Sequence, residues 1–315
     1  MFKKILASLG KGAATVDLTF GNKCYRPGED IHGEVILQGG DVDQKLNSLA
    51  VRLMLNVTSS RGQLSRAVTT IPLPIDRVVK AKERKAIPFH YTIPTDIPFT
   101  RSYVSYHFET LLDIEGGVDR TDVDRLVIEP SERIQSVFRS LERFGFREKP
   151  DSGKVDSYGQ EFAFFPNQQF AGHINEVELR LAGQDSGIQV FMEVDIRNGY
   201  HEIEAKREFF IPNGVLQTES ELDDMLLSVI QETANQPYAY SQPFSFRQHG
   251  HQGSGKGSMI PGMIGGLAVG ILGSMALNEL MDGFDAEGMM EDAMGEIEDV
   301  EEGFDSFFGG DDEEF

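Results

Sequence analysis

Apolar and polar residues alternate along much of the first 130 positions, which is the pattern of half-buried β-strands. Residues 15–20 place Val16, Leu18 and Phe20 on one face, and residues 31–37 alternate in the same way. Pro27-Gly28 presets a tight turn between these two stretches, because proline fixes φ and glycine accepts positive φ. In 31–37 the odd-numbered residues share one face, so His32 is expected on the opposite face. The pattern predicts an antiparallel hairpin at the start of a β-sandwich.

The period then changes at residues 131–146, where apolar residues recur at helical spacing and charged residues take the other face. A second β-rich stretch follows from residue 158 to about 246. Two alternating runs on either side of residues 183–187 predict a hairpin, and residues 222–229 predict a short helix. The chain is therefore expected to be mainly β, with two β-sandwich domains joined by an amphipathic helix.

These changes in pattern and composition predict six segments. They are a short N-terminal amphipathic helix (1–12), a β-sandwich (13–129), a connecting helix and linker (130–154), a second sandwich-like domain (155–247), a glycine-rich linker with an apolar segment (248–278) and an acidic tail (279–315).

Charge is concentrated at the C-terminus. The net charge is −22, and residues 279–315 hold 16 Asp and Glu with no Lys or Arg. An acidic chain is repelled by phosphates, which argues against nucleic acid as a partner. One cysteine, Cys24, excludes an intramolecular disulfide and fits a reducing cytoplasm. Residues 1–9 lack the long apolar stretch of a secretory signal and are expected to form a helix docked on the body.

The apolar C-terminal segment has two interpretations. Residues 257–278 are 22 uncharged residues, which as a helix would span about 33 Å, close to the bilayer core of ~30 Å. Gly262, Gly266, Gly270 and Ser274 recur every four residues, so they would form a stripe where another helix could approach closely. The segment is therefore a candidate for membrane insertion or self-association. The alternative is a mobile tail or a helix folded back on the body, since its glycines and Pro261 weaken any long helix.

A cluster of charges precedes the connecting helix. Asp113, Glu115, Asp119, Asp122 and Asp124 could be read as a cation site, but their glycines precede the aspartates instead of interrupting them as in a calcium loop. Arg120 and Arg125 supply countercharge. We therefore predict a structural polar network of five residues near the domain junction: Asp119, Arg120, Asp122, Asp124 and Arg125.

Other chemistry is not indicated by the sequence. The seven histidines are scattered and suggest no metal-ligand set, and Gly253-Ser254-Gly255-Lys256 lacks the context of a nucleophile elbow or phosphate loop. We expect no catalytic residues, no metal and no cofactor.

Several segments, in order, resemble bacterial sporulation-control proteins of the SpoOM family. They are residues 1–10, 25–33, 87–94, 112–124, 141–146, 160–166 and 193–197. The resemblance covers about residues 1–245. It implies an arrestin-like fold in both sandwiches and a cytoplasmic, non-enzymatic adaptor that acts in signalling or cell development through protein partners of unknown identity. The alternative function is a membrane-associated stress or envelope protein anchored or oligomerised through 257–278.

Overall fold

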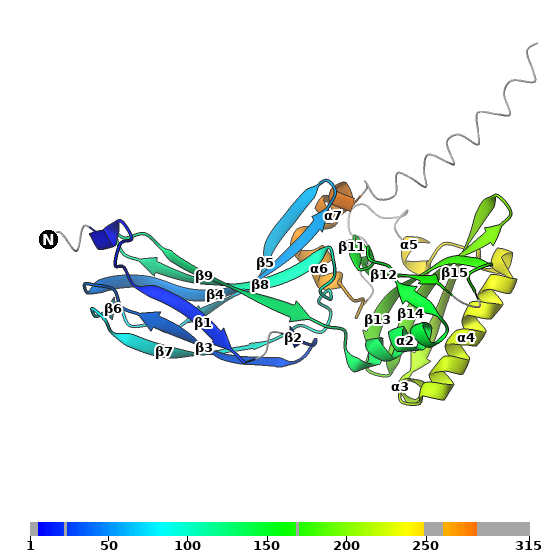
Figure 1. Cartoon of the computed structure of the whole chain (residues 1–315), viewed down its shortest axis with the longest axis horizontal. Helices are drawn as coiled ribbons and strands as arrows, with labels where there is room; N and C mark the ends of the chain where they lie inside the picture. The colour runs from blue at the N-terminus through cyan, green and yellow to red at the C-terminus, as the bar shows by residue number, and fades with distance from the viewer. Residues whose placement is uncertain (1–5, 22–23, 168–169, 249–260, 282–315) are drawn as a thin grey trace, which may run out of the picture.

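The computed structural model describes residues 6–21, 24–167, 170–248 and 261–281. Figure 1 shows an elongated molecule in which a first region (13–129) and a second region (130–248) follow one another end to end. A C-terminal segment (261–281) lies between them. The start of the expected N-terminal helix, most of the glycine-rich linker and the acidic tail beyond residue 281 lie outside the described residues.

The first region is a sandwich of two sheets. One sheet has three antiparallel strands in the order β1 (Thr15–Phe20), β3 (Asp30–Gln38) and β7 (Arg84–Thr92). The other has the order β2 (Cys24–Tyr25), β9 (Arg120–Ile128), β8 (Val104–Ile114), β4 (Gln44–Ser59) and β5 (Gly62–Leu73), with β6 (Val78–Val79) beside β4. Only β2 and β9 pair in parallel among these strands.

Phe108 of β8 lies at the centre of this sandwich and is fully buried. Its ring meets Phe20, Phe89 and Tyr91 of the opposite sheet edge-on, at centroid distances of 5.6, 5.3 and 6.2 Å. Edge-to-face contacts of this kind add to the apolar area that the rings bury. The alternation expected for residues 31–37 is confirmed, because Ile31, Val35 and Leu37 are buried. The core is built from inward-facing residues of both sheets.

The second region has one antiparallel sheet. Its strand order is β10 (Phe146–Glu148), β12 (Gly159–Pro166), β13 (Ile174–Gln184), β14 (Gly187–Asn198) and β15 (His201–Pro212), with β11 (Lys154–Asp156) paired to β12. The hairpin expected around 183–187 is present, since Gln184 pairs with Gly187. The prediction of a mainly β fold is thus confirmed.

Helices cover one face of this sheet (Figure 1). They are α2 (Glu132–Arg143), α3 (Asn213–Leu216) and α4 (Glu219–Asn235), followed by the 3-10 turn η1 (Pro237–Tyr240). The short helix α5 (Ser245–Gln248) lies on the opposite face, where its Phe246 contacts Phe191 of β14. Phe138 of α2 lies 5.0 Å from the ring of Phe162 and 5.3 Å from that of Phe164. Arg143 of α2 donates to Asp223 of α4 at 2.6 Å. The layer opposite the sheet is therefore helical, because the apolar residues of 131–146 and 219–235 recur at helical spacing.

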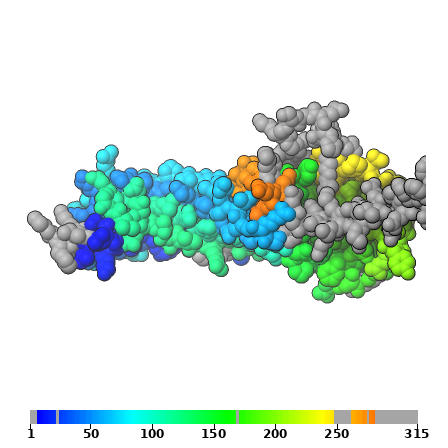
Figure 2. Space-filling model, turned by 90° about the horizontal axis from the view of Figure 1, so that it is seen from above, coloured from blue at the N-terminus to red at the C-terminus, as the bar shows by residue number. Residues whose placement is uncertain are grey.

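The C-terminal segment contains α6 (Gly266–Leu272) and α7 (Ser274–Met281), which lie against β5, β11 and β12. In Figure 2 these orange atoms lie where the first region meets the second. Gly273, at a φ of +83°, separates the two helices. None of the helices in the described part of the chain is long and apolar enough to span a bilayer.

Candidate functional site

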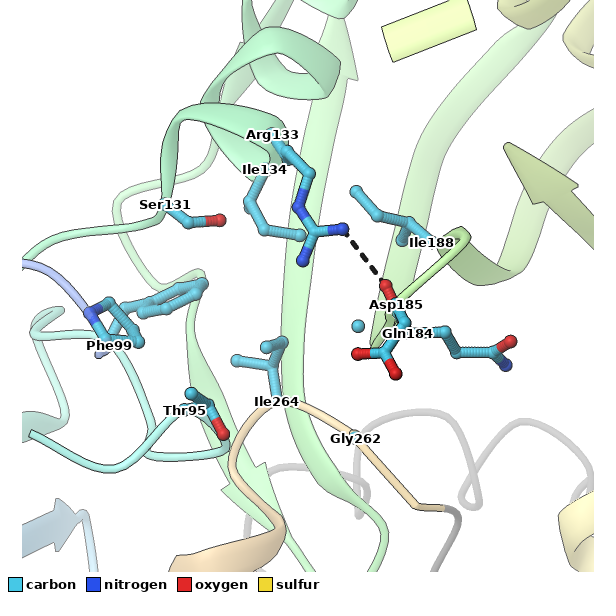
Figure 3. Close-up of a pocket in the computed structure, with 12 residues that line it drawn as sticks. Thr95, Phe99, Ser131, Arg133, Ile134, Gln184, Asp185, Ile188, Gly262 and Ile264 are labelled. Atoms are coloured by element: carbon cyan, nitrogen blue, oxygen red, sulfur yellow. Dashed lines mark hydrogen bonds between the residues drawn. The ribbon is translucent and has the colours of Figure 1, made fainter. Parts of the chain in front are cut away.

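The two regions meet around a cavity of about 220 Å³ (Figure 3). Its walls include Thr95 and Phe99 of the first region, Arg133 and Ile134 of α2, and Ile264 of the C-terminal segment. The turn between β13 and β14 closes one side. The shape of this cavity therefore depends on how these stretches of chain are held together.

Arg133 forms the polar side of the cavity. Its Nη1 donates to the carbonyl oxygen of Gln184 at 3.0 Å and to Oδ1 of Asn213 at 3.1 Å. Asn213 in turn donates to the carbonyl oxygen of Asp185 at 2.7 Å. Figure 3 shows the guanidinium directed at this turn. Arg133 thus fixes the β13–β14 turn relative to the helix that connects the two regions.

Gln160 joins the two regions through its side-chain amide. It is fully buried. Its Oε1 accepts from the backbone N–H of Phe99 at 2.7 Å, and its Nε2 donates to the carbonyl oxygens of Phe99 and Gly153 at 2.9 and 3.0 Å. A buried amide is stable only when its polar atoms are hydrogen-bonded. Separating the regions would break this set of bonds inside an apolar contact.

An ion pair lies beside that amide. Nε of Arg101 donates to Oε1 of Glu148 at 2.8 Å, and Ser152 donates to the same oxygen at 2.9 Å. The guanidinium also lies 5.8 Å from the ring centre of Phe162. Gly153 allows this close packing, because a Cβ there would lie 2.4 Å from Cγ of Arg101. The junction therefore combines charge, a buried amide and aromatic rings.

The C-terminal segment pairs with both regions through its backbone. Ile264 donates to the carbonyl oxygen of Leu181 and accepts from the N–H of Gln160, both at 2.8 Å, while Gly183 donates to Gly262 at 2.8 Å. On the other side, Gly265 donates to the carbonyl oxygen of Asp96 at 3.0 Å. The segment acts as a short added strand at one end of the second sheet and also holds the 93–99 loop of the first region.

Gly262 makes this pairing possible. Its φ is +77°, and a Cβ on it would lie 1.9 Å from the carbonyl oxygen of Gly183. An L-residue with a side chain would be strained in this backbone conformation and would also clash with β13. The pairing of the C-terminal segment thus depends on a glycine at this position.

Comparison with known proteins identifies the family. A family model described as SpoOM protein matches residues 2–199, which is more than half of the chain. The chain belongs to this family. A relative, "Sporulation-control protein spo0M" of Bacillus subtilis (strain 168), is 28% identical over 252 residues, which cover 75% of this chain and 98% of the relative.

The crystal structure of that Bacillus subtilis sporulation control protein matches with a TM-score of 0.60 at 24% sequence identity. The match covers 70% of this chain and 99% of the solved one. It supports a shared fold. The family match ends at residue 199, so the C-terminal segment of this SpoOM-family chain lies beyond it.

The polar network predicted for β9 lies away from the junction in this SpoOM-family chain. Asp122 Oδ2 accepts from the N–H of Leu18 at 2.9 Å, and Arg120 donates to the carbonyl oxygen of Gly10. In Figure 1 the N-terminal segment lies at the far end of the sandwich. The expected position near the domain junction was wrong, because β9 begins at that far end and only its last residues approach the second region.

The other three predicted members lie along the same strand or just before it. Asp119 accepts from the N–H of Ile114 at 3.3 Å. Asp124 is half-buried and Arg125 is exposed, opposite Phe108 and His107 respectively on β8. Asp122 and Asp124 share the inward face of β9 with the buried Leu126. Of the five residues, Asp122 and Arg120 therefore contact the backbone of β1 and of the N-terminal segment, while Asp124 and Arg125 lie further along β9.

The glycine stripe does not lie along one helix. Gly262 precedes α6, Gly266 and Gly270 belong to α6, and Ser274 begins α7. Gly266 is buried and Gly270 is exposed. The positive φ angles of Gly262, Gly265 and Gly273 interrupt any continuous helix through the described part of 257–278. In its described part the segment instead forms two short helices that lie against the body, on β5, β11 and β12.

The outer face of the second sheet carries crowded carboxylates. Burial, together with the negative charges of Glu161 and Glu193, raises the pKa of Glu178 to about 9. Burial and neighbouring carboxylates, Glu193 first, raise the pKa of Asp195 to about 8. Taking a charge out of water and placing it beside like charges both favour its neutral form.

Basic side chains compensate part of this negative charge. Arg180 is buried and donates to Asp156 and Glu161 at 2.8 and 2.6 Å. Lys206 donates to Glu193 at 3.0 Å, and Lys149 donates to Glu176 at 2.8 Å. The face is an ion-pair network with an excess of carboxylates.

Proposed function

We propose that this SpoOM-family chain is a non-catalytic regulatory adaptor in sporulation control, and that it works in the cytoplasm by binding protein partners. Two comparisons support the regulatory part: the SpoOM family match and the relative named as a sporulation-control protein. The adaptor part rests on the junction between the regions.

One observation carries the proposal: the second sheet accepts an extended segment at its end. Leu181, Gly183 and Gln160 form backbone hydrogen bonds with Gly262 and Ile264 of the C-terminal segment. Backbone bonds of this kind give affinity with little dependence on sequence, which is how extended peptides add to sheets in protein recognition. A partner strand could therefore take the place of the C-terminal segment.

The same exchange would change the junction. Gly265 and Leu267 donate to the carbonyl oxygen of Asp96 at 3.0 and 3.5 Å, so the segment also holds the loop that carries Phe99. Displacement would free this loop from the segment, and the two regions would then be held by their direct contacts, among them Gln160 and the Arg101–Glu148 pair. Partner binding would in this way alter the relative position of the regions.

The test uses full-length protein carrying Gly262→Val. We expect the branched side chain to detach the segment, so that hydrogen exchange at the amides of Gln160 and Gly183 becomes faster. In sporulating cells of the source organism, crosslinking should then recover more of the same partner proteins than wild type does. Gly214→Ala is the matched control, because a Cβ at Gly214 meets nothing within 4 Å. Equal crosslinking by wild type and Gly262→Val, with exchange faster in the variant, would contradict the proposal.

The alternative function gives a different result in the same cells. If residues 257–278 anchor the chain in a membrane or hold an oligomer, wild type should sediment with membranes or elute as an oligomer. Gly262→Val should not increase partner capture in that case. Cell fractionation and light scattering on the same two variants distinguish the two functions.

A further inference from the structure

Three side chains that commonly bind metals lie together on the outer face of the first region. Asp30 and His32 belong to β3, and His90 belongs to β7. Their neighbours Ile31 and Phe89 are buried in the sandwich core. Because successive side chains of a strand point to opposite faces, Asp30, His32 and His90 all point outward, and all three are exposed.

The strand register places these side chains beside one another. His32 pairs directly with His90, and Asp30 pairs with Thr92. The two imidazole rings lie 4.8 Å apart between centroids. Nε2 of His90 lies 3.5 Å from Oδ1 of Asp30. One ligand atom from each of the three side chains lies within 4.8 Å of the other two.

These separations fit a tetrahedral ion. With metal–ligand bonds of roughly 2.0–2.1 Å, neighbouring ligand atoms around zinc lie about 3.4 Å apart. The distance between His90 and Asp30 already has this value. The remaining separations, none above 4.8 Å, need to shorten by at most about 1.4 Å, which rotations of the exposed side chains supply without moving the strands.

Thr92 positions the carboxylate. Its Oγ1 donates to Oδ1 of Asp30 at 2.5 Å, so the carboxylate is held toward His90. Hydrogen bonds to a ligating group orient it, and their loss typically weakens metal binding.

We propose that Asp30, His32 and His90 bind a divalent transition-metal ion, with zinc as the best match. Two imidazoles and one carboxylate suit zinc, copper(II) or nickel, whereas magnesium and calcium prefer sites made of oxygen ligands. Three protein ligands leave a fourth position for water or for a side chain of a partner. The ion would join the edge strand β7 to β3.

An ion that links β7 to β3 would also affect the loop that follows β7. Strand β7 leads directly into Ile93, whose N–H and carbonyl oxygen bond to Glu29 and Gly28 at 3.0 and 2.8 Å. The same loop continues to Asp96, which accepts from the C-terminal segment. A bound ion would therefore stabilise the strand end from which this loop leaves the first region. This inference does not depend on the proposed adaptor function.

The experiment is a calorimetric titration of full-length, EDTA-treated protein with zinc chloride. An excess of magnesium chloride occupies the acidic tail, and His249→Gln with His251→Gln removes two further imidazoles from the background. We expect one saturable zinc site, which His32→Gln or His90→Gln abolishes. Thr92→Val should weaken it about tenfold. His201→Gln, an exposed histidine on β15, is the matched control and should leave binding unchanged.

Folding is checked by thermal unfolding in EDTA, where all variants should match wild type because the substituted side chains are exposed. Cobalt(II) gives a second readout, since a tetrahedral site with nitrogen and oxygen ligands produces visible absorption bands that His32→Gln should remove. The proposal is overturned if wild type shows no saturable zinc binding, or if His32→Gln and His90→Gln bind zinc as tightly as the control.

Discussion

The two regions bury their sheets in different ways. In the first region both sides of the core come from strands, and Phe108 of one sheet packs against Phe20, Phe89 and Tyr91 of the other. In the second region, helices α2 and α4 cover the inner face, while the outer face carries carboxylates and the end of the sheet pairs with the C-terminal segment. The first region thus builds its core from its own two sheets. The second sheet depends on elements from elsewhere in the chain.

The largest expected effect comes from Phe162→Ala. Phe162 is fully buried and contacts Phe138 of α2 at 5.0 Å and Phe99 of the first region at 5.8 Å. Its truncation should lower the free energy of unfolding by about 3–5 kcal/mol. Because the ring serves both the helical layer and the junction, amides of the second region should lose hydrogen-exchange protection before those of the first.

Phe108→Ala is the matched comparison. This change removes an equally buried ring, so a loss of about 3–5 kcal/mol is again expected. Hydrogen exchange should now become faster in the first region alone. If both variants loosened both regions to the same extent, the two cores would form one cooperative unit and the comparison would not hold.

Much of the fold follows from local patterns in the sequence. Period-2 alternation predicted the strands around residues 15–37 and the β13–β14 hairpin, because each has one buried face. Residues 131–146 predicted α2, since Ile134, Val137, Phe138 and Leu141 share one helical face and are all buried. The helical layer over the second sheet was not anticipated, because it depends on α2 and α4 packing together across distant positions.

The junction was the part that local patterns did not locate. Gln160 stands in a strand otherwise rich in phenylalanine, and a lone amide there is a signal for a buried hydrogen-bonding role. Its partner, the backbone of Phe99, has no signature in the sequence. His32 and His90 likewise lie far apart in the sequence, and only the β3–β7 register brings them together. Gly262 fits the stripe of small residues on a continuous helix equally well by sequence, and only its positive φ angle excludes it from one.

A smaller effect concerns the outer face of the second sheet and depends on pH. The folded-state pKa of Glu178 is raised to about 9 and that of Asp195 to about 8. The folded protein therefore holds protons that the unfolded chain releases near pH 4, and the stability these groups contribute is complete below that value. This contribution to stability decreases as the pH rises above about 4, and it is lost once the pH has risen through the folded-state pKa values of about 8 and 9. The free energy of unfolding should therefore decline between about pH 4 and pH 9.

Glu178→Gln tests this cause. The amide cannot ionise, so the variant should unfold at higher urea concentration than wild type at pH 9 and show a shallower decline between pH 5 and 9. The exposed Glu142→Gln, on α2, is the control and should follow the wild-type pH curve. If Glu178→Gln and wild type declined in parallel, the pH dependence would have another origin.

The smallest expected effect tests the polar end of the sandwich. Asp122 joins β9 to β1 by accepting from the N–H of Leu18 at 2.9 Å. Asp122→Ala removes this acceptor and should lower the free energy of unfolding by roughly 1.5–3 kcal/mol, the range for one lost hydrogen bond to a charged group. Asp17→Ala, an exposed change on β1, should cost less in the same urea titration.

The network is expected to be structural, so calcium and magnesium should bind no differently to Asp122→Ala than to wild type in calorimetry. A micromolar calcium site that disappears with Asp122→Ala would instead make this end of the sandwich a cation site. The first region would then differ from the second by binding an ion, and not only by how its core is packed.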